Sequence, residues 1–430
     1  MSLELAGPVV EHFESRLLPE GIELTGTGRL RRLSIEFPGW LTPRQVEDAV
    51  GMDIEHELGV TARVRLRSGQ RIRIEIALES DSSDLVTVPG PVLRVEGPHR
   101  PVSWLAGASA EIVLPSNEGP GLLTQRRGLS TPGGEPGVCH PLEAEVTLRA
   151  RHLTSSAWTY EAQEGDLLDV PSEPTWLPWV RYVERGRAVE IIVPDGVVTV
   201  DERTSVDEVD DEFEVYPPEG LSTVGIWGAG GQTLVEVGAH RGLPGLRSLV
   251  AHEQPHDDAW CYVALRHLLE SQADDELLDR IDWVLGDLED SPTAWSACAS
   301  KLATQLGLPL AEQADRAATT VLARGRADDV LLLAMHQLVP VDVASGGWPV
   351  GDFDRVGVEA IAALSYGRIN TDDVPERGRD VAVAKLYAAG LGESERGLHA
   401  AACAQVAEGR LLSSLSVRPN PTDVAWLSIQ

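Results

Sequence analysis

The spacing of apolar residues changes near Leu246, and this change constrains the fold more than any other feature of the sequence. Before that point, apolar and polar residues alternate in short segments separated by Gly, Pro, Asn and Asp, the pattern of β-strands joined by turns. After it, apolar residues recur at the spacing of amphipathic helices. The sequence therefore predicts an α+β, multi-domain chain with a β-rich N-terminal part and an all-α C-terminal part. Its 430 residues suit two or three domains.

Residues 1–80 are predicted to form a small α/β unit. Residues 9–18 have helical spacing, and Thr42-Pro43 provides an N-cap followed by proline at the first position of a second helix, which ends near residue 58. Three segments alternate as strands: 30–37, 60–66 and 72–78. Residues 67–70 are typical of a hairpin turn between the last two. This order suits a small sheet with helices on one face.

Residues 84–242 are predicted to form a β-rich domain similar to a sandwich or an open barrel. Seven strands are expected between turn signals: 92–95, 110–114, 144–148, 188–193, 197–200, 221–227 and 233–237. The Gly/Pro-rich stretch 117–141 is interpreted as a long loop or a boundary. Residues 225–231 are rich in glycine, but a strand-like segment follows instead of the helix that a phosphate site needs, so we interpret them as a hairpin turn. The acidic run 201–214 is expected to be a solvated loop or a protected edge strand.

Residues 246–415 are predicted to form an all-α domain of helical hairpins, which would stack as a short solenoid or close into a bundle. Eight helices are expected: 257–271, 275–288, 292–306, 310–323, 327–338, 356–365, 377–389 and 393–412. Several begin with capping residues and end near glycine. Residues 416–430 are expected to form a short extended segment that docks on the body.

The charge balance is strongly acidic. The chain has 67 acidic and 36 basic residues, a formal net charge of −31, and only two lysines, Lys301 and Lys385. A field of this sign repels phosphate backbones, so we expect no binding to nucleic acid. Arginines alternate with other residues at 63–73, which is typical of the solvated face of a hairpin. The carboxylate excess suits a halophile, whose salt screens the self-repulsion, with an acidic high-GC bacterium as the alternative.

The cysteines and the N-terminus predict a cytoplasmic protein. The four cysteines are widely spaced and form no CxxC pair, which suits buried free thiols in a reducing compartment. The N-terminal residues lack the basic and apolar regions of a signal peptide. No apolar run approaches the roughly 20 residues needed to cross a bilayer, so no membrane span is expected.

One histidine cluster is a candidate metal site. Residues 252–256 formally match the HExxH pattern of zinc proteases, but Pro255 would disturb the helical turn that must align both histidines. A looser site for a divalent metal would use His252, His256 and Asp257. The alternative is a polar linker in which the acidic pair at 257–258 caps a helix N-terminus.

Tryptophan is unusually frequent, with 11 Trp against four Phe and six Tyr. Trp158, Trp176 and Trp179 occur close together among prolines. Such residues form a candidate surface for a peptide or a glycan, or close one end of a sandwich core.

No catalytic signature accompanies these features. Cys139-His140 lacks a third orienting group, and adjacent side chains seldom face each other. Asp352 and Asp354 suit either a cation or a helix N-cap. The sequence therefore favours a non-catalytic adaptor or scaffold that binds a protein partner in a cytoplasmic complex. A metal-dependent hydrolase using His252, His256 and Asp257 is one alternative, and a regulatory module that binds a small ligand is another.

Overall fold

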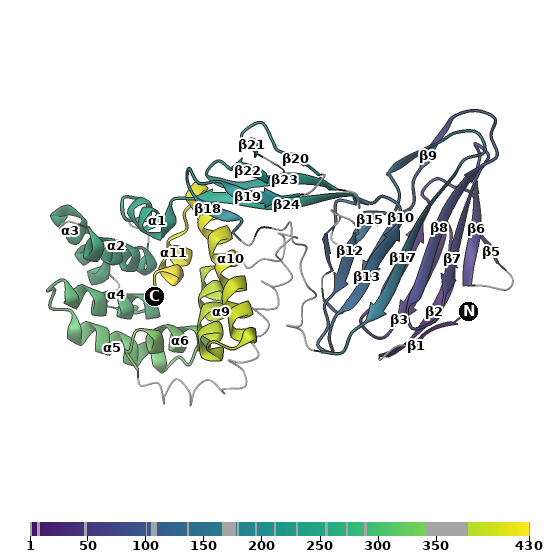
Figure 1. Cartoon of the computed structure of the whole chain (residues 1–430). Coiled ribbons are helices and arrows are strands. Elements are labelled where there is room, and N and C mark those ends of the chain that lie inside the picture. Colours follow the sequence, from purple (N-terminus) through teal and green to yellow (C-terminus); the bar gives the residue numbers. More distant parts are fainter. Residues whose placement is uncertain are drawn as a thin grey trace.

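The chain combines β-sheets and helices in the predicted order. The computed structural model describes residues 2–6, 9–46, 50–99, 101–104, 110–135, 137–165, 178, 180–193, 196–209, 212–228, 231–253, 257–271, 274–287, 290–339 and 377–429. Strands fill the described chain up to His240, and helices follow from Gly242 (Figure 1). The prediction of an α+β, multi-domain fold is confirmed.

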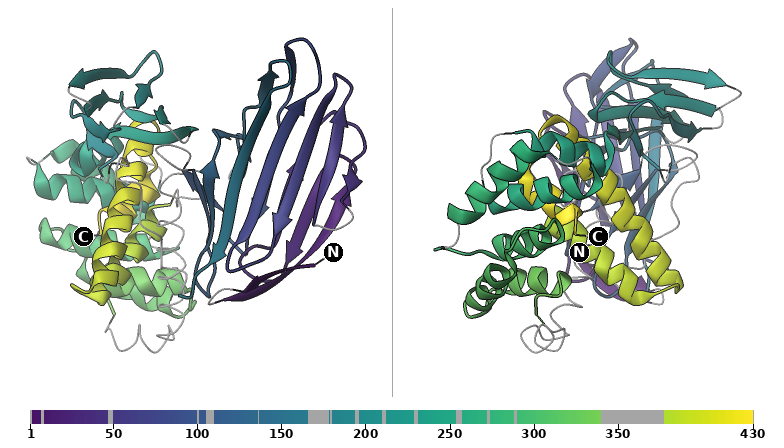
Figure 2. Two further views of the ribbon diagram at one scale, coloured as in Figure 1. Left: turned by 45° about the vertical axis from the view of Figure 1, so that its right-hand side comes forward. Right: turned by 90° about the vertical axis from the view of Figure 1, so that its left-hand side faces the viewer.

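Two antiparallel sheets of described residues pack face to face as a large β-sandwich (Figure 2). The first sheet has the order β1 (Ser2–Ala6), β2 (Val10–Leu18), β3 (Gly21–Gly26), β4 (Arg32–Glu36), β10 (Val92–Glu96), β15 (Val138–His140) and β14 (Thr131–Pro132). The second has the order β11 (Val102–Trp104), β12 (Glu111–Leu114), β13 (Gly121–Arg127), β17 (Leu153–Ala162), β8 (Ile72–Ser80), β7 (Val60–Arg67), β6 (Val50–His56) and β5 (Arg44–Gln45). A separate pair is formed by β9 (Val86–Pro89) and β16 (Glu145–Leu148).

The core of the sandwich lies between these sheets. Buried and more exposed residues alternate along β7 and β8, so every second side chain enters the core. Phe13 of β2 and Tyr160 of β17 meet edge to face with ring centroids 6.0 Å apart. Burial of this shared apolar surface holds the two sheets together.

The helix predicted at residues 9–18 is wrong, because this segment forms the strand β2. Its residues pair with β1 on one side and β3 on the other. Glu11 and Phe13 both point into the core, and Glu11 is buried beside Arg29. A charged residue at an inward position hides the two-residue period of the strand.

The helix predicted at residues 42–58 is also wrong. Residues 50–56 form β6, which pairs with β7 from end to end. Gly51 suits this strand because a Cβ atom there would lie 2.3 Å from the carbonyl oxygen of Val64. The loop predicted at 117–141 likewise needs correction, since it contains β13, β14 and β15. The hairpin predicted around residues 67–70 is confirmed.

Strands from either side of residues 80–84 belong to the same sheets. β4 pairs with β10 in the first sheet, and β8 pairs with β17 in the second. The sandwich therefore takes in strands from Ser2 to Ala162.

A second, smaller pair of sheets follows the sandwich. The four-stranded sheet has the order β18 (Tyr182–Glu184), β24 (Gly231–His240), β23 (Gly220–Gly228) and β20 (Val197–Thr199). The three-stranded sheet has the order β19 (Val189–Ile192), β22 (Glu212–Tyr216) and β21 (Ser205–Val209). All seven strands predicted between residues 84 and 242 are confirmed, as is the hairpin around 225–231. Part of the acidic run forms the edge strand β21.

The helices begin directly after β24. Their described bounds are α1 (Gly242–Ala251), α2 (Asp258–Glu270), α3 (Asp275–Asp287), α4 (Ala294–Gln305), α5 (Ala311–Leu322), α6 (Ala327–Met335), α9 (Gly378–Leu391), α10 (Glu395–Val417) and α11 (Pro421–Leu427). Seven of the eight predicted helices are confirmed, and the one predicted at 356–365 lies outside the described residues. The start of α1 at Gly242 was missed.

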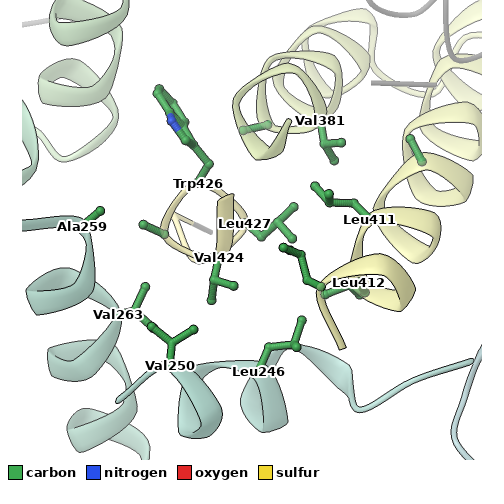
Figure 3. Packing of buried hydrophobic residues seen from close by; sticks show 14 of the residues in the cluster. Leu246, Val250, Ala259, Val263, Val381, Leu411, Leu412, Val424, Trp426 and Leu427 are labelled. Atoms are coloured by element: carbon green, nitrogen blue, oxygen red, sulfur yellow. The ribbon is translucent and has the colours of Figure 1, made fainter. Parts of the chain in front are cut away.

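The extended C-terminal segment predicted at 416–430 is wrong. Helix α10 continues to Val417, and α11 follows it. Asn420 is the N-cap of α11 and accepts a hydrogen bond from the Asp423 backbone. Pro421 stands at the first helical position, where its missing N–H has no cost. The predicted docking does occur: Val424 and Leu427 are buried among α1, α2, α9 and α10 (Figure 3).

The helices and the two small sheets share one apolar core, separate from the core of the large sandwich. Val113 of β12 and Leu122 of β13 join the cluster that contains the small sheets and the helices. α10 packs against the four-stranded sheet on β23 and β24. No helix within the described ranges is long and apolar enough to cross a membrane.

Candidate functional site

The residues of the predicted metal site lie at the junction of α1 and α2. His252 is the C-cap of α1 and its Nδ1 donates to the Ser248 carbonyl oxygen at 2.7 Å. Asp257 is the N-cap of α2, and its Oδ1 accepts from the Trp260 backbone at 2.8 Å. The two residues therefore belong to different helices, His252 at the end of α1 and Asp257 at the start of α2.

The histidine that faces His252 belongs to α2. The rings of His252 and His267 lie 5.8 Å apart between centroids. Burial and the neighbouring His252 lower the pKa of His267, in that order of size. Among the described residues, no group of three His, Cys, Asp or Glu side chains is placed to hold a metal ion. His256 lies outside the described residues, so the metal site of His252, His256 and Asp257 stays a prediction.

The predicted tryptophan surface needs correction at Trp158. This side chain is 1% exposed in the sandwich core, where its Nε1 donates to Ser156 Oγ at 3.0 Å. It lies on the inner face of β17 and offers no surface to a partner. Trp176 and Trp179 lie outside the described residues.

Two other sequence candidates have structural roles. Cys139 is buried in the sandwich, and burial raises the pKa of its thiol to about 12, which disfavours the thiolate at neutral pH. Four of the five arginines between residues 63 and 73 form ion pairs with carboxylates on neighbouring strands: Arg63 with Glu79, Arg65 with Asp53, Arg67 with Glu75, and Arg71 with Glu161. Most of the positive charge of this stretch is therefore neutralised locally.

A more promising surface lies on the outer face of the four-stranded sheet. Residues opposite each other in antiparallel strands share a face. Val197 of β20 pairs with Trp227 of β23, and Leu234 of β24 pairs with Gly225 two residues before Trp227. The side chains of Val197, Trp227 and Leu234 therefore point to the same side. We call these three residues, with the neighbouring Thr199 and Thr223, the Trp227 face.

The opposite face of this sheet is fully occupied. Its inward residues pack against the three-stranded sheet and are buried: Val198, Val224, Ile226, Val235 and Val237. Because the inward residues form the core, the outward residues are not needed for core packing and can contact another molecule. The alternation of buried and exposed residues along β23 separates the two faces.

Helix α10 covers only one end of the outer face. Arg410 of α10 donates Nε to Glu236 Oε1 at 2.8 Å, and the hydroxyl of Tyr182 in β18 donates to the same oxygen at 2.8 Å. A Cβ atom at Gly238 would lie 2.8 Å from Oγ of Ser413, so helix and sheet are in close contact there. Glu236, which contacts α10, lies opposite Thr223 in the neighbouring strand. The Trp227 face, which includes Thr223, therefore begins next to the part of the sheet that α10 covers.

The uncovered end is apolar and exposed. Val197 is 56%, Trp227 42% and Leu234 48% exposed. Apolar side chains that are exposed together, in contrast to single ones, are typical of interaction surfaces. The sequence does not reveal this surface, because the pattern of the strands 221–227 and 233–237 does not tell which face of the sheet α10 will cover.

The three-stranded sheet carries an acidic segment at its edge. The chain runs from the edge strand β20 of the four-stranded sheet into this segment, which forms β21. Carboxylates are exposed there at Glu202, Asp207 and Glu208, and at Glu212 of β22.

Comparisons with known proteins leave the chain without a family. No family model matches it, and no curated protein matches it. One solved structure, titled a polysaccharide lyase, is similar with a TM-score of 0.49 and 11% identity, over 92% of this chain and 82% of that chain. A likeness of this size says nothing about function.

Proposed function

We propose that this chain is a non-catalytic adaptor that holds a protein partner on the Trp227 face, in a cytoplasmic complex. The observation that carries the proposal is the half-covered outer face of the four-stranded sheet. One half packs under α10, and the other half exposes Val197, Trp227 and Leu234. Tryptophan contributes strongly to binding energy when a partner buries it.

The occupant we propose is an amphipathic helix of another protein. The neighbouring half of the same face already receives a helix, α10, and the Trp227 face continues that surface. The acidic net charge of the chain favours basic residues beside the apolar positions of the incoming helix. The net charge of −31 disfavours nucleic acid as the occupant.

The test has two stages. The tagged full chain is first mixed with extract of its own cells at their salt concentration, and bound proteins are identified by mass spectrometry. The partner is then purified and titrated against the wild-type chain, Trp227→Ala and Trp283→Ala. Trp283 of α3 is a matched control because it is 68% exposed and lies on another element.

We expect Trp227→Ala to weaken binding by at least about tenfold, the loss typical of a tryptophan at the centre of an interface. Trp283→Ala should bind as the wild type does. A segment of the partner should protect the Trp227 face from hydrogen exchange and be helical with basic flanks. The absence of a stoichiometric partner, or a partner that ignores Trp227→Ala, would contradict the proposal.

A further inference from the structure

Two histidine rings face each other between α1 and α2, on a different part of the chain from the Trp227 face. The ring centroids of His252 and His267 lie 5.8 Å apart, and the ring planes are inclined by 68°. Two imidazoles that bind one ion through nitrogen–metal bonds of about 2.1 Å have centroids about 5–6 Å apart. The distance between the two rings therefore suits a shared metal ion. We call His252 and His267 the histidine pair.

His252 is oriented as metal-binding histidines usually are. Its Nδ1 donates a hydrogen bond to the Ser248 carbonyl oxygen at 2.7 Å, so the neutral ring carries its proton on Nδ1 and a lone pair on Nε2. A backbone carbonyl that accepts from the other ring nitrogen fixes the tautomer and the direction of a ligand histidine. No described residue forms a hydrogen bond with Nε2 of His252, which leaves this atom to an ion.

His267 also has the protonation state that a metal ligand needs. Burial lowers its pKa, and the neighbouring His252 lowers it further, so the ring is neutral at neutral pH. A neutral imidazole keeps one unprotonated nitrogen, which is the atom that binds metals. His252 is exposed and His267 is half-buried. An ion with its water molecules therefore reaches the histidine pair directly from the solvent.

The surroundings of the histidine pair favour a cation. His252 is the C-cap of α1, and His267 lies in the last turn of α2, where the carbonyl groups of a helix carry a partial negative charge. Glu270 and Asp274 both raise the pKa of His267, so their negative charges act on its ring. Arg247 acts in the opposite direction, but its charge is balanced by an ion pair with Glu270.

Ring packing alone explains only part of this arrangement. Edge-to-face packing accounts for the contact between the two rings. It does not require nitrogen atoms, and without an ion the two imidazoles would repel each other once both were protonated. A metal ion between the rings would use a nitrogen from each of them.

We propose that His252 and His267 bind one divalent transition metal ion, such as zinc, at the surface between α1 and α2. Each ring gives one nitrogen to the ion, and water completes the coordination, because the described residues place no third His, Cys, Asp or Glu around it. Imidazole suits zinc, copper and nickel, whereas Mg²⁺ and Ca²⁺ prefer oxygen ligands. The ion connects the two helices and so stabilises the folded chain. This site does not rest on the adaptor proposal.

The test titrates zinc into the full chain by isothermal calorimetry. Excess Mg²⁺ is present throughout, because it occupies carboxylates of this acidic chain that would otherwise bind zinc weakly. The variants are His252→Asn and His267→Asn, which replace an imidazole with a polar amide. His12→Asn is the matched control, because His12 is an exposed histidine on β2 of the sandwich. Urea unfolding with and without zinc gives a second readout, and circular dichroism checks the fold of each variant.

We expect one zinc ion per chain, bound at least about tenfold more weakly by each pair variant, because two ligands on one scaffold bind an ion more tightly than one. His12→Asn should bind as the wild type does. Zinc should raise the urea midpoint of the wild type and of His12→Asn, but not that of His252→Asn or His267→Asn.

If His267→Asn fails to fold, His252→Asn carries the test, since the His252 side chain is exposed. The proposal is overturned if no zinc binds in excess Mg²⁺, or if either pair variant binds zinc as tightly as the wild type. It is also overturned if His12→Asn loses as much affinity as the pair variants.

Discussion

Arg410 of α10 donates its Nε to Glu236 of β24 at 2.8 Å, across the junction between the helices and the four-stranded sheet. The side chains are only 9% and 12% exposed, so neither charge is well hydrated. Glu236 also accepts the Tyr182 hydroxyl on the same oxygen. One buried carboxylate therefore connects two strands of the sheet with the long helix that packs on it.

Replacing Arg410 with alanine should destabilise the protein strongly. The substitution leaves the Glu236 carboxylate buried without its cation, and breaking such a pair costs about 3–5 kcal/mol. Urea unfolding followed by circular dichroism measures the loss in free energy. Arg185→Ala is the control, because Arg185 is 72% exposed in its pair with Glu219 and should cost less than about 1 kcal/mol. Equal losses in both variants would contradict this account.

Tyr160→Phe should destabilise the sandwich. The Tyr160 hydroxyl donates to Oε2 of Glu11 at 2.7 Å, and both residues are buried between the sheets. Removing the hydroxyl leaves a carboxylate oxygen without its donor, which costs about 1–3 kcal/mol. Tyr216→Phe removes a similar bond to Glu214 near the surface and should leave the unfolding midpoint unchanged. If Tyr160→Phe leaves the free energy of unfolding unchanged, water replaces the lost donor.

The same buried carboxylate explains where prediction from sequence failed. Strands such as β7 and β8 could be predicted, because their inward positions are all apolar. β2 could not, since Glu11 occupies an inward position and its partners Arg29 and Tyr160 are 18 and 149 residues away along the chain. Local spacing then fits a helix equally well.

The candidate sites could not be predicted from the sequence for a related reason. Trp227 could be assigned to a strand, but its exposure depends on where α10 ends on the sheet, and the two are far apart in sequence. The rings of Tyr262, Trp295 and Trp426 come together from α2, α4 and α11, so no local pattern contains their contacts. Trp158 allowed two interpretations from sequence, a binding surface or a place in a sandwich core, and its inward position on β17 puts it in the core.

His336 should make the protein less stable as the pH falls. Burial lowers the pKa of this ring to about 4 in the folded chain, against 6.5 when it is unfolded. Between these values the unfolded chain binds more protons than the folded chain. The contribution of neutral His336 to the free energy of unfolding is therefore complete above pH 6.5. It is lost as the pH falls toward 4, by up to about 3 kcal/mol.

The comparison of wild type with His336→Gln isolates this effect. Asp258 and Asp423 have raised pKa values through burial and change stability in the opposite direction, but they are present in both proteins. The unfolding free energy of the wild type minus that of His336→Gln should decrease by up to about 3 kcal/mol as the pH falls from 7 to 4. A constant difference across this range would show that His336 does not titrate as described.

The four cysteines should be unreactive in the native protein. All four are buried, and none forms a disulfide bond. Burial raises the pKa of Cys139 to about 12 and the pKa of Cys298 well above its usual value, so little thiolate is present at neutral pH. A colorimetric disulfide reagent should label none of them before unfolding and all four in guanidinium. Fast labelling of the native chain would show that one thiol is accessible.

Trp426→Ala should unfold the helical part at lower denaturant concentration. Its side chain is 7% exposed, and α11 is surrounded by α1, α2, α9 and α10 (Figure 3). Truncating a buried tryptophan removes apolar contacts and leaves a cavity, at a cost of about 3–5 kcal/mol. The matched variant Trp283→Ala, on the exposed face of α3, should change stability by less than about 0.5 kcal/mol. If both variants unfold at the same urea concentration, α11 is not the central support of these helices, and its burial contributes little to their stability.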